Sequence, residues 1–334
     1  MPETILVTGG SGFIGSYVLR ALAERGDRAI NFDVRPPGPE AAWYLNPVAD
    51  RVPFVQGSID ELADLVQAVK QYEPAAIVHI GAIVHDLPRQ PQLALRVNVG
   101  GTVQVLEVMR IFGLRRLVYF STIGVLTARQ YEPIDARHPV MTATDGPGVG
   151  FYAASKVASE VFCWSYRQSF GTDFITIRPS AVYGFGQQVP NFIKPMVENA
   201  VRGAPSHFAT GGPLPRDYTH VLDVTQLTLA ALDVPAAEVR DRIFYGATGE
   251  PLNTAADVAE IVKRVVPGAQ IEIGSGIAEE DQLEMRFRGR LSIDNAREQL
   301  GYRPRFLRLE DGVAEYIQSY RQFLHATREP RQGT

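Results

Sequence analysis

Tyr152 and Lys156 stand four positions apart, a spacing that places both side chains on one face of a helix. An ammonium group beside a phenol favours the phenolate, so we expect Lys156 to lower the pKa of Tyr152 from its usual value of about 10. Tyr152 could then accept a proton from an alcohol or donate one to a carbonyl group. Ordinary amphipathic helices also contain this spacing, so the pair needs support from a second motif.

That second motif is a glycine-rich segment far upstream, Thr8-Gly9-Gly10-Ser11-Gly12-Phe13-Ile14-Gly15. It follows a short apolar run and opens a stretch with apolar residues at helical spacing, which is the strand–turn–helix context of a dinucleotide site. Glycines permit a tight turn and close approach of the backbone to a pyrophosphate, and the helix N-terminus supplies unpaired N–H groups. Glycines also mark ordinary turns, but this context favours a pyrophosphate site.

Asp33 ends the next apolar run, near the ~20-residue separation at which dinucleotide-binding units carry an acid. A carboxylate at this place accepts hydrogen bonds from the ribose hydroxyls and repels a 2′-phosphate, which favours NAD over NADP. Arg35 lies two residues further on and leaves NADP open as the alternative. With Tyr152 and Lys156, these residues predict nicotinamide redox chemistry at an alcohol carbon.

The elements that position these residues follow from an alternation of apolar runs and helical patterns. Strands are expected near 4–8, 29–33, 52–56, 76–80 and 117–121, and helices at 13–22, 61–71 and 92–112. Strands that alternate with helices predict a parallel sheet covered on both faces. We therefore predict an α/β fold with a doubly wound parallel (Rossmann) sheet and a smaller mixed α/β C-terminal substrate domain.

The alternation loosens beyond about residue 175, where a strand at 243–245 and helices at 192–201, 224–232, 255–266 and 309–323 are expected. Residues 35–40 and 127–150 are predicted to be surface connections. The predicted domains are an NAD-binding domain at 1–178, to which 217–250 returns, and a substrate-binding region at 179–216 and 251–330.

Two hydroxyl residues, Ser121 and Thr122, follow the predicted strand at 117–120. The carboxyl ends of parallel strands face the cofactor crevice, so a hydroxyl group there can bond to the reacting oxygen. Serine and threonine also simply end strands, and the position alone does not decide between the two interpretations.

The composition excludes several other classes of function. The 334 residues carry 33 basic and 37 acidic side chains, a net charge of −4 without a basic patch, so neither nucleic acid nor a membrane surface is an expected partner. The start of the chain lacks the pattern of a signal peptide, and the single Cys163 fits a reducing compartment, so a cytoplasmic location is expected. The histidines lack metal-ligand spacing, so no metal site is expected, and His79 is interpreted as a hydrogen-bonded strand-end residue.

The order of the motifs resembles the extended short-chain dehydrogenase/reductases, and within them the NAD-dependent epimerase/dehydratase family, whose members include nucleotide-sugar epimerases. The resemblance covers nearly the whole chain. It rests on the glycine loop, Asp33, His79-Ile80-Gly81-Ala82, Asn98-Val99-Gly100-Gly101-Thr102, Ser121-Thr122, Tyr152-x-x-x-Lys156, Arg178-Pro179-Ser180-Ala181-Val182-Tyr183-Gly184, 216–224 and Gly301-Tyr302-Arg303-Pro304.

The resemblance implies a role for each matching position. Thr122, Tyr152 and Lys156 would be catalytic, and Ser121, Thr122, Ser180 and Arg216 would contact the substrate. Arg216 would meet an anionic group such as a sugar-nucleotide phosphate, although an ion pair with Asp217 or Asp223 would give it a purely structural role. NAD would be held by Gly9, Gly12, Phe13, Ile14, Gly15, Asp33, Ser58, Ile59, Gly81 and Ala82, together with Tyr152 and Lys156.

Departures from the family pattern bear on the substrate. Ile123 and Gly124 stand where dehydratases carry an Asp-Glu pair, which disfavours elimination of water. Segment 82–98 is shorter than in hexose-nucleotide epimerases, and Ala181 replaces a frequent asparagine. The first hypothesis is an NAD-dependent epimerase of a sugar, with a nucleotide-linked sugar favoured; the second is an NAD-dependent dehydrogenase/reductase of a small polar alcohol, amino alcohol or sugar acid.

A third hypothesis, a protein that binds NAD without catalysis, has less support because a sensor would not need Thr122, Tyr152 and Lys156. The resemblance also implies a homodimer in which the helices at 92–112 and 150–170 pair across a twofold axis. Val99, Val103, Leu106 and Ile111 on the first helix, and Val157, Val161 and Trp164 on the second, give both helices wide apolar faces.

Overall fold

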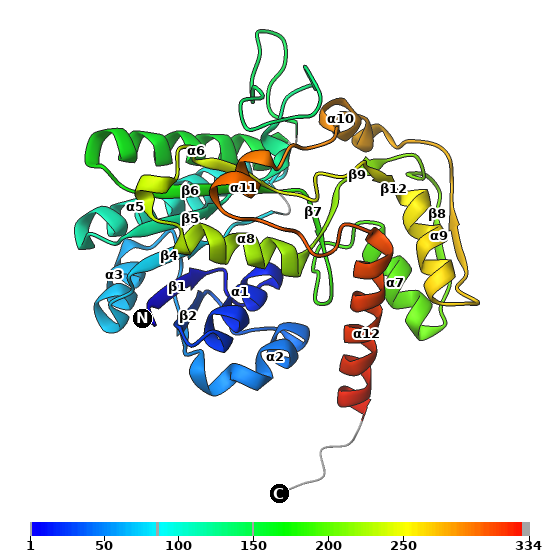
Figure 1. Cartoon of the computed structure of the whole chain (residues 1–334), viewed down its shortest axis with the longest axis horizontal. Helices are drawn as coiled ribbons and strands as arrows, with labels where there is room; N and C mark the ends of the chain where they lie inside the picture. The colour runs from blue at the N-terminus through cyan, green and yellow to red at the C-terminus, as the bar shows by residue number, and fades with distance from the viewer. Residues whose placement is uncertain (1, 85–86, 149, 329–334) are drawn as a thin grey trace, which may run out of the picture.

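A computed structural model of the chain describes residues 2–84, 87–148 and 150–328, and its centre is a seven-stranded sheet (Figure 1). Every neighbouring pair of strands is parallel, in the order β3-β2-β1-β4-β5-β6-β11. The order reverses direction between β1 and β4, which is the point where doubly wound sheets bind nucleotides. The strands are β1 (Thr4–Thr8), β2 (Arg28–Asp33), β3 (Phe54–Gln56), β4 (Ala76–His79), β5 (Arg116–Phe120), β6 (Phe174–Pro179) and β11 (Ile243–Gly246).

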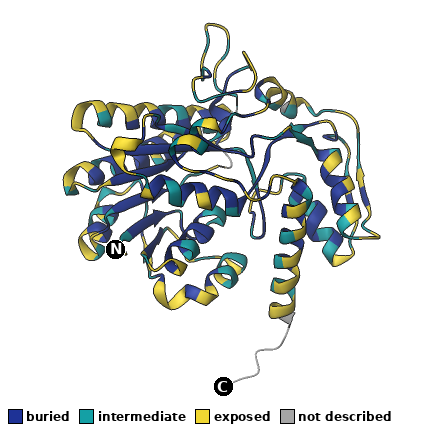
Figure 2. Ribbon diagram, in the orientation of Figure 1, coloured by how far each residue is buried: buried dark blue, intermediate teal, exposed yellow. Residues whose placement is uncertain are grey.

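Helices cover both faces of this sheet, because alternate side chains of each buried strand point to opposite faces. In β1, Ile5 and Val7 join the core beneath α1 (Phe13–Glu24) and α8 (Val221–Asp233). Leu6 points the other way, into the core beneath α3 (Leu62–Tyr72), α5 (Gly101–Phe112) and α6 (Gly150–Phe170). The central strands β1, β4, β5 and β6 are accordingly buried along almost their whole length, whereas the edge strand β3 is partly exposed (Figure 2). The predicted doubly wound α/β fold is confirmed.

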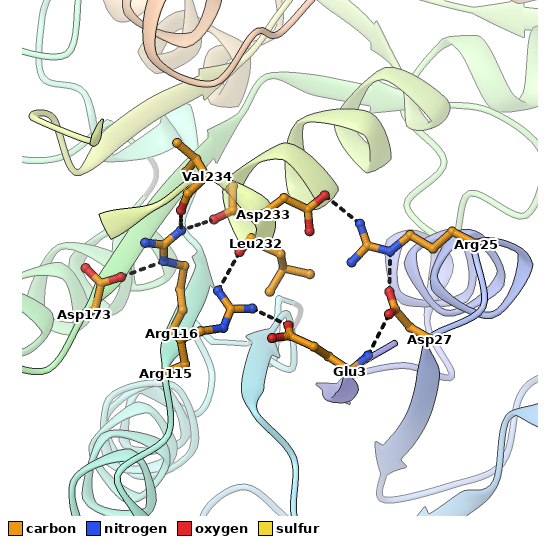
Figure 3. Close-up of polar contacts among 10 residues, drawn as sticks. Glu3, Arg25, Asp27, Arg115, Arg116, Asp173, Leu232, Asp233 and Val234 are labelled. Carbon is orange, nitrogen blue, oxygen red and sulfur yellow. Dashed lines mark hydrogen bonds and ion pairs between the residues drawn. The ribbon is translucent and has the colours of Figure 1, made fainter. Parts of the chain in front are cut away.

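The amino ends of the strands carry a network of arginines and carboxylates (Figure 3). Arg116, 1% exposed, donates from Nε to Asp173 Oδ2 at 2.6 Å and from Nη1 to the carbonyl oxygens of Ala231 and Val234. Arg115 donates to the carbonyl oxygen of Leu232 at 2.8 Å. These carbonyl groups lie at the C-terminus of α8, where helical partners are missing. The network therefore fastens α8 to the sheet at the edge opposite the carboxyl ends of the strands.

A second, smaller core lies beside the sheet. Its side chains come from α7 (Ile193–Arg202), α9 (Ala255–Val265) and α12 (Leu309–Arg328), which pack against one another. Residues 287–302 return to the core around the sheet, to which they contribute Phe287 and Tyr302 among others. Short strand pairs connect the parts: β7 (Ala181–Tyr183) with β10 (Tyr218–His220), β9 (Pro215–Arg216) with β12 (Asn253–Thr254), and β8 (Ser206–Phe208) with β13 (Ile271–Ile273).

Several elements differ from the sequence-based prediction. The segment expected as connection contains the start of α2 (Pro39–Leu45), which a 3₁₀ helix at Asn46–Arg51 continues. The helix expected at 92–112 is divided into α4 (Pro91–Leu93), a π-helical segment η2 (Ala94–Gly100) and α5. The short helices α10 (Glu279–Phe287) and α11 (Asp294–Gln299) were not predicted. No helix among the described residues is both long and apolar enough to cross a membrane.

Candidate active site

A cleft of about 1320 Å³ opens at the carboxyl ends of the strands and extends toward the smaller core. With Lys156 as the exception, every residue predicted to be in the site lines this cleft. These residues are Gly9, Gly12, Phe13, Ile14, Gly15, Asp33, Ser58, Ile59, Gly81, Ala82, Ser121, Thr122, Tyr152, Ser180 and Arg216.

The glycine loop has two kinds of glycine. Gly9 has a φ of +69°, and a Cβ there would lie 2.6 Å from the Gly81 nitrogen; a Cβ at Gly15 would lie 2.2 Å from the Gly9 oxygen. Gly12 differs, because its Cβ would meet only the Gly9 oxygen, at 3.2 Å. It precedes α1, whose first N–H groups lack helical partners and receive no side-chain cap. Gly9 and Gly15 thus pack the loop, and Gly12 leaves room for a pyrophosphate at the helix N-terminus.

Asp33 lies at the end of β2, where its Oδ2 accepts a hydrogen bond from the Ser11 N–H at 3.2 Å. Burial raises the pKa of Asp33, while the N–H groups of Ser11, Val34 and Arg35 oppose that rise. The exposed Arg35 also lines the cleft. The carboxylate therefore lies at the edge of the cleft beside the glycine loop, as a residue that binds a ribose would.

Ser58 and Ile59 form the neighbouring wall of the cleft. The Ser58 N–H donates to Asp64 at 2.9 Å, and the Ser58 hydroxyl bonds to Asp60, so its polar atoms already have protein partners. Ile59 is 8% exposed and packs tightly enough that a Cβ at Gly101 would lie 2.8 Å from its side chain. This wall therefore offers mainly apolar contact to a flat ring.

Thr122 and Tyr152 line the cleft, and Lys156 lies near Tyr152 without lining the cleft itself. Lys156 Nζ donates to the Phe120 carbonyl oxygen at 2.8 Å and lies 5.8 Å from the centroid of the Tyr152 ring. Burial raises the pKa of Tyr152 to about 12 and lowers that of Lys156 to about 8. The predicted lowering of the Tyr152 pKa by Lys156 is therefore wrong for the protein alone, because desolvation dominates.

Two hydroxyl groups follow β5 and differ in their bonding. Thr122 caps a 3₁₀ turn at Ile123–Val125, and its Oγ1 accepts from the Gly124 N–H at 3.0 Å. The Ser121 hydroxyl is buried and has no hydrogen-bond partner among the residues that the structure describes. Thr122 Oγ1 still carries its own proton for donation, so both hydroxyls can bond to an oxygen in the cleft.

Asn98, which had been assigned no role, joins the elements around Tyr152. Its Nδ2 donates to Ser155 Oγ at 3.0 Å, and its Oδ1 accepts from the Ile83 N–H at 2.8 Å. The Asn98 carbonyl oxygen accepts from the hydroxyls of Thr102 at 2.7 Å and Ser159 at 3.2 Å. These bonds accompany the π-helical segment, a local feature that is frequent at functional sites and that apolar periodicity does not reveal.

His79 has the structural role predicted for it. Its Nδ1 lies 2.7 Å from Thr8 Oγ1, and its Nε2 lies 3.1 Å from Thr102 Oγ1. Burial, assisted by Lys156, lowers the pKa of His79 to about 3, so the ring is neutral at physiological pH. Within the described ranges, no group of His, Cys, Asp and Glu side chains could hold a metal ion.

Arg216 lines the cleft from β9, in an ion-pair cluster that the sequence did not predict. It pairs with Glu284 at 3.1 Å, and Glu284 also accepts from Arg288 at 2.5 Å. Asp217 instead bonds to Thr219 and Thr248, and Asp223 bonds to backbone N–H groups at 305 and 306. Glu284 and Arg288 both line the cleft and lie four residues apart on or beside α10. The sequence contains no signal that would bring them to Arg216.

Comparison with known proteins agrees with this geometry. A family model described as the NAD dependent epimerase/dehydratase family matches residues 5–245. The UDP-glucose 4-epimerase of Mycolicibacterium smegmatis is 29% identical over 330 residues, which cover 95% of this chain and 98% of that protein. The Bos taurus UDP-glucose 4-epimerase is 28% identical over 273 residues, covering 75% of this chain and 78% of the relative.

The fold is also similar to solved structures. The Thermus thermophilus UDP-glucose 4-epimerase, solved in complex with NAD, superposes with a TM-score of 0.78. It is 26% identical, and the match covers 95% of this chain and 99% of that one. The likeness therefore includes both the sheet and the smaller core.

Proposed function

The chain belongs to the NAD-dependent epimerase/dehydratase family, and from that membership we propose that it is an NAD-dependent epimerase of a nucleotide-linked sugar. It is an enzyme, and its cofactor is NAD. One observation carries the proposal: a single cleft connects the glycine loop, the Thr122–Tyr152 pair and the Arg216–Arg288 cluster. That order suits a substrate whose reacting carbon lies beside the cofactor and whose anionic group lies further out.

In the proposed mechanism, Tyr152 is the general base. Its phenolate form accepts the proton of a secondary alcohol and becomes the phenol, and Thr122 donates a hydrogen bond to the same substrate oxygen. NAD, held by the glycine loop and Asp33, would supply a hydride acceptor that also returns the hydride, so epimerisation would need no net oxidant or reductant. Lys156 adds positive charge behind Tyr152, and the proton returns to the oxygen after the ketone has presented its other face. Ile123 and Gly124 offer no acid or base for elimination of water.

Cofactor absorbance tests the net reaction. An epimerase regenerates its cofactor, so a substrate that is turned over should produce no stoichiometric NADH. We expect a thermal-shift screen of nucleotide sugars and sugar acids, with NAD present, to identify that substrate by a raised melting temperature. Stoichiometric NADH formation in proportion to added substrate would contradict epimerisation.

The alternative is an NAD-dependent dehydrogenase/reductase of a small polar alcohol, amino alcohol or sugar acid. One observation favours it, namely that Glu284 already neutralises part of the positive charge of Arg216 and Arg288. In that case the screen would select a small alcohol rather than a nucleotide sugar.

We expect NAD to bind more tightly than NADP, and replacement of Asp33 to remove most of that preference. The carboxylate would accept from the ribose hydroxyls, and a bond to a charged group contributes about 1.5–3 kcal/mol. Asp33→Asn should therefore lower the affinity for NAD by about tenfold or more while changing that for NADP much less. Titration of both proteins with both cofactors measures the effect. Tighter binding of NADP by the unmodified protein would contradict the assignment and would favour Arg35 as the determinant.

We also propose a homodimer formed by α5 and α6. Ile111, Val161 and Trp164, all predicted at the interface, are 52%, 57% and 38% exposed, and Phe162 adds a further apolar side chain at 40%. Val99 and Leu106 were predicted there too, but they are 7% and 0% exposed because they pack within the chain.

Light scattering at low micromolar concentration should give about twice the mass of one chain, 36.8 kDa. Val161→Glu should shift the protein toward the monomer, because a carboxylate in an apolar twofold contact meets its own copy. A monomeric mass for the unmodified protein would contradict this assignment of the two helix faces.

A further inference from the structure

Two segments of the cleft wall come from distant parts of the sequence. One follows β2 and supplies the lining residues Asp33, Val34, Arg35, Pro36 and Gly38. The other follows β7 and supplies the lining residues Gln187, Gln188, Val189 and Asn191. We call residues 33–38 the ribose wall, because Asp33 is proposed to bind the cofactor ribose, and residues 184–191 the β7 loop. The β7 loop leads into α7 of the smaller core.

The ribose wall continues directly into α2, which begins at Pro39. Pro36, Pro37 and Pro39 surround Gly38 in this connection, and Gly38 itself is extended, with a φ of −68° and a ψ of 175°. Proline fixes its own φ at about −65° and restricts the residue before it, so this connection is stiff. A restraint on the ribose wall therefore also restrains α2.

The helix α2 lies against the β7 loop. The ring of Trp43 meets the ring of Phe185 edge to face, with centroids 5.1 Å apart. Phe185 is 1% exposed and lies two residues before Gln187, which lines the cleft. Glu40, in the first turn of α2, lies beside the same loop, since a Cβ at Gly186 would be 3.7 Å from the Glu40 Cβ. Trp43 thus connects α2 to the buried part of the β7 loop.

Tyr17 of α1 reinforces the contact between α2 and the β7 loop. Its hydroxyl is buried and donates to the Phe185 carbonyl oxygen at 3.0 Å. Its ring stacks on Tyr44 of α2, with centroids 3.9 Å apart, and meets Phe13 edge to face at 5.8 Å. Phe13 lines the cleft at the glycine loop. One packed aromatic cluster therefore joins the glycine loop, α2 and the β7 loop, and close packing transmits a displacement from one part to the next.

We propose that Trp43 is a positioning residue that transmits occupancy of the cofactor site to the β7 loop. Bound NAD restrains the ribose wall, the prolines restrain α2 with it, and the contact between Trp43 and Phe185 restrains the loop. Such ordering of one segment by a ligand bound at another is a coupling between two sites. The inference goes beyond the proposed function, because it concerns NAD and two segments of this chain and does not depend on the substrate.

Hydrogen exchange of the full chain, measured by mass spectrometry with and without saturating NAD, tests the proposal without turnover. The quantity compared is the ratio of the two exchange rates for peptides of the β7 loop. We expect NAD to slow this exchange about fivefold or more in the unmodified protein, the lower end of the usual coupling between sites. Trp43→Leu should remove most of the effect. Trp43→Phe keeps a ring against Phe185 and should retain most of it.

A second variant changes the connection and leaves the aromatic cluster intact. Pro37 does not line the cleft, and Pro37→Gly makes the connection to α2 flexible. NAD should then slow exchange in the glycine loop as before but slow exchange in the β7 loop much less. Pro235→Gly is the matched control, because Pro235 is exposed and lies after α8 at the opposite edge of the sheet. It should leave both effects unchanged.

A purely structural role of Trp43 predicts a different result, because its loss would then speed exchange equally with and without NAD. Direct contact between NAD and the β7 loop predicts the same ratio in every variant. An unchanged ratio in Trp43→Leu or in Pro37→Gly would therefore overturn the proposal, as would a β7 loop that does not respond to NAD in the unmodified protein. If Trp43→Leu does not fold, Pro37→Gly decides alone. Failure of the epimerase hypothesis would be visible in NADH formation, which this measurement does not involve.

Discussion

Tyr152→Phe should reduce turnover by about 100- to 10,000-fold, the range that a positioned general acid or base contributes. The substitution keeps the aromatic ring at the base of the cleft and removes only the hydroxyl group whose proton would move. NAD affinity should therefore change little. Steady-state rates, together with NAD titration of the same preparation, measure both effects.

A matched control is available on the same helix. Tyr166 bonds through its hydroxyl to Glu107 at 2.5 Å, outside the residues that line the cleft, so Tyr166→Phe should keep nearly full activity. Lys156→Met should lower both turnover and NAD affinity, since the family resemblance gives this lysine a contact with the nicotinamide ribose. Retention of more than about a tenth of the rate by Tyr152→Phe would rule out the general-base role.

The general-base role requires the phenolate form of Tyr152, which is scarce in the protein alone. Burial holds the pKa of the phenol at about 12, so very little phenolate exists at neutral pH. The pair spacing correctly placed Tyr152 and Lys156 on one helix, α6. It could not reveal that the lysine bonds to the Phe120 carbonyl oxygen, because that partner lies 36 residues away in sequence. The spacing of two residues in the sequence shows that their side chains lie close together on a helix. The change in pKa caused by desolvation depends on all the atoms packed around each group, which the spacing does not show.

The parts of the fold that were predictable are those that a local sequence pattern specifies, and the parts that were not depend on tertiary contacts. The buried strands are continuous apolar runs separated by amphipathic helices, so residues such as Ile5 and Val7 predict a parallel sheet from local pattern alone. Helix α10 has no such pattern, because Leu283 and Met285 are exposed and its charged residues form tertiary ion pairs. Its contribution to the site was therefore invisible in the sequence.

The π-helical segment shows a second kind of limit. Its residues have good helical periodicity, which is why a continuous helix was expected at 92–112. The deviation is accompanied by hydrogen bonds that the Asn98 carbonyl oxygen accepts from the hydroxyls of Thr102 and Ser159, and Ser159 lies on another helix. The spacing of apolar residues predicts which face of a helix is buried. It does not predict a hydrogen bond between a side chain and a backbone carbonyl oxygen.

Arg216→Ala should raise the KM for a diphosphate-linked substrate by about 10- to 150-fold while lowering kcat much less. A charge-assisted hydrogen bond contributes about 1.5–3 kcal/mol, and each 1.4 kcal/mol corresponds to a factor of ten. In the proposed mechanism the arginine contacts the anionic group and not the reacting carbon, so its bond to an anion should form in the ground state and persist in the transition state. Loss of such uniform binding appears in KM.

Arg286→Ala is the matched control, because Arg286 lies on the same helix as Glu284 but is 52% exposed, pairs with Asp145 and does not line the cleft. It should leave KM unchanged. A small uncharged alcohol, if it is a substrate, should respond weakly to both variants. If Arg216→Ala lowers the melting temperature and leaves KM unchanged, then Arg216 serves only to neutralise Glu284. The hypothesis of a nucleotide-linked substrate would then lose its main support, and the result would favour the dehydrogenase alternative.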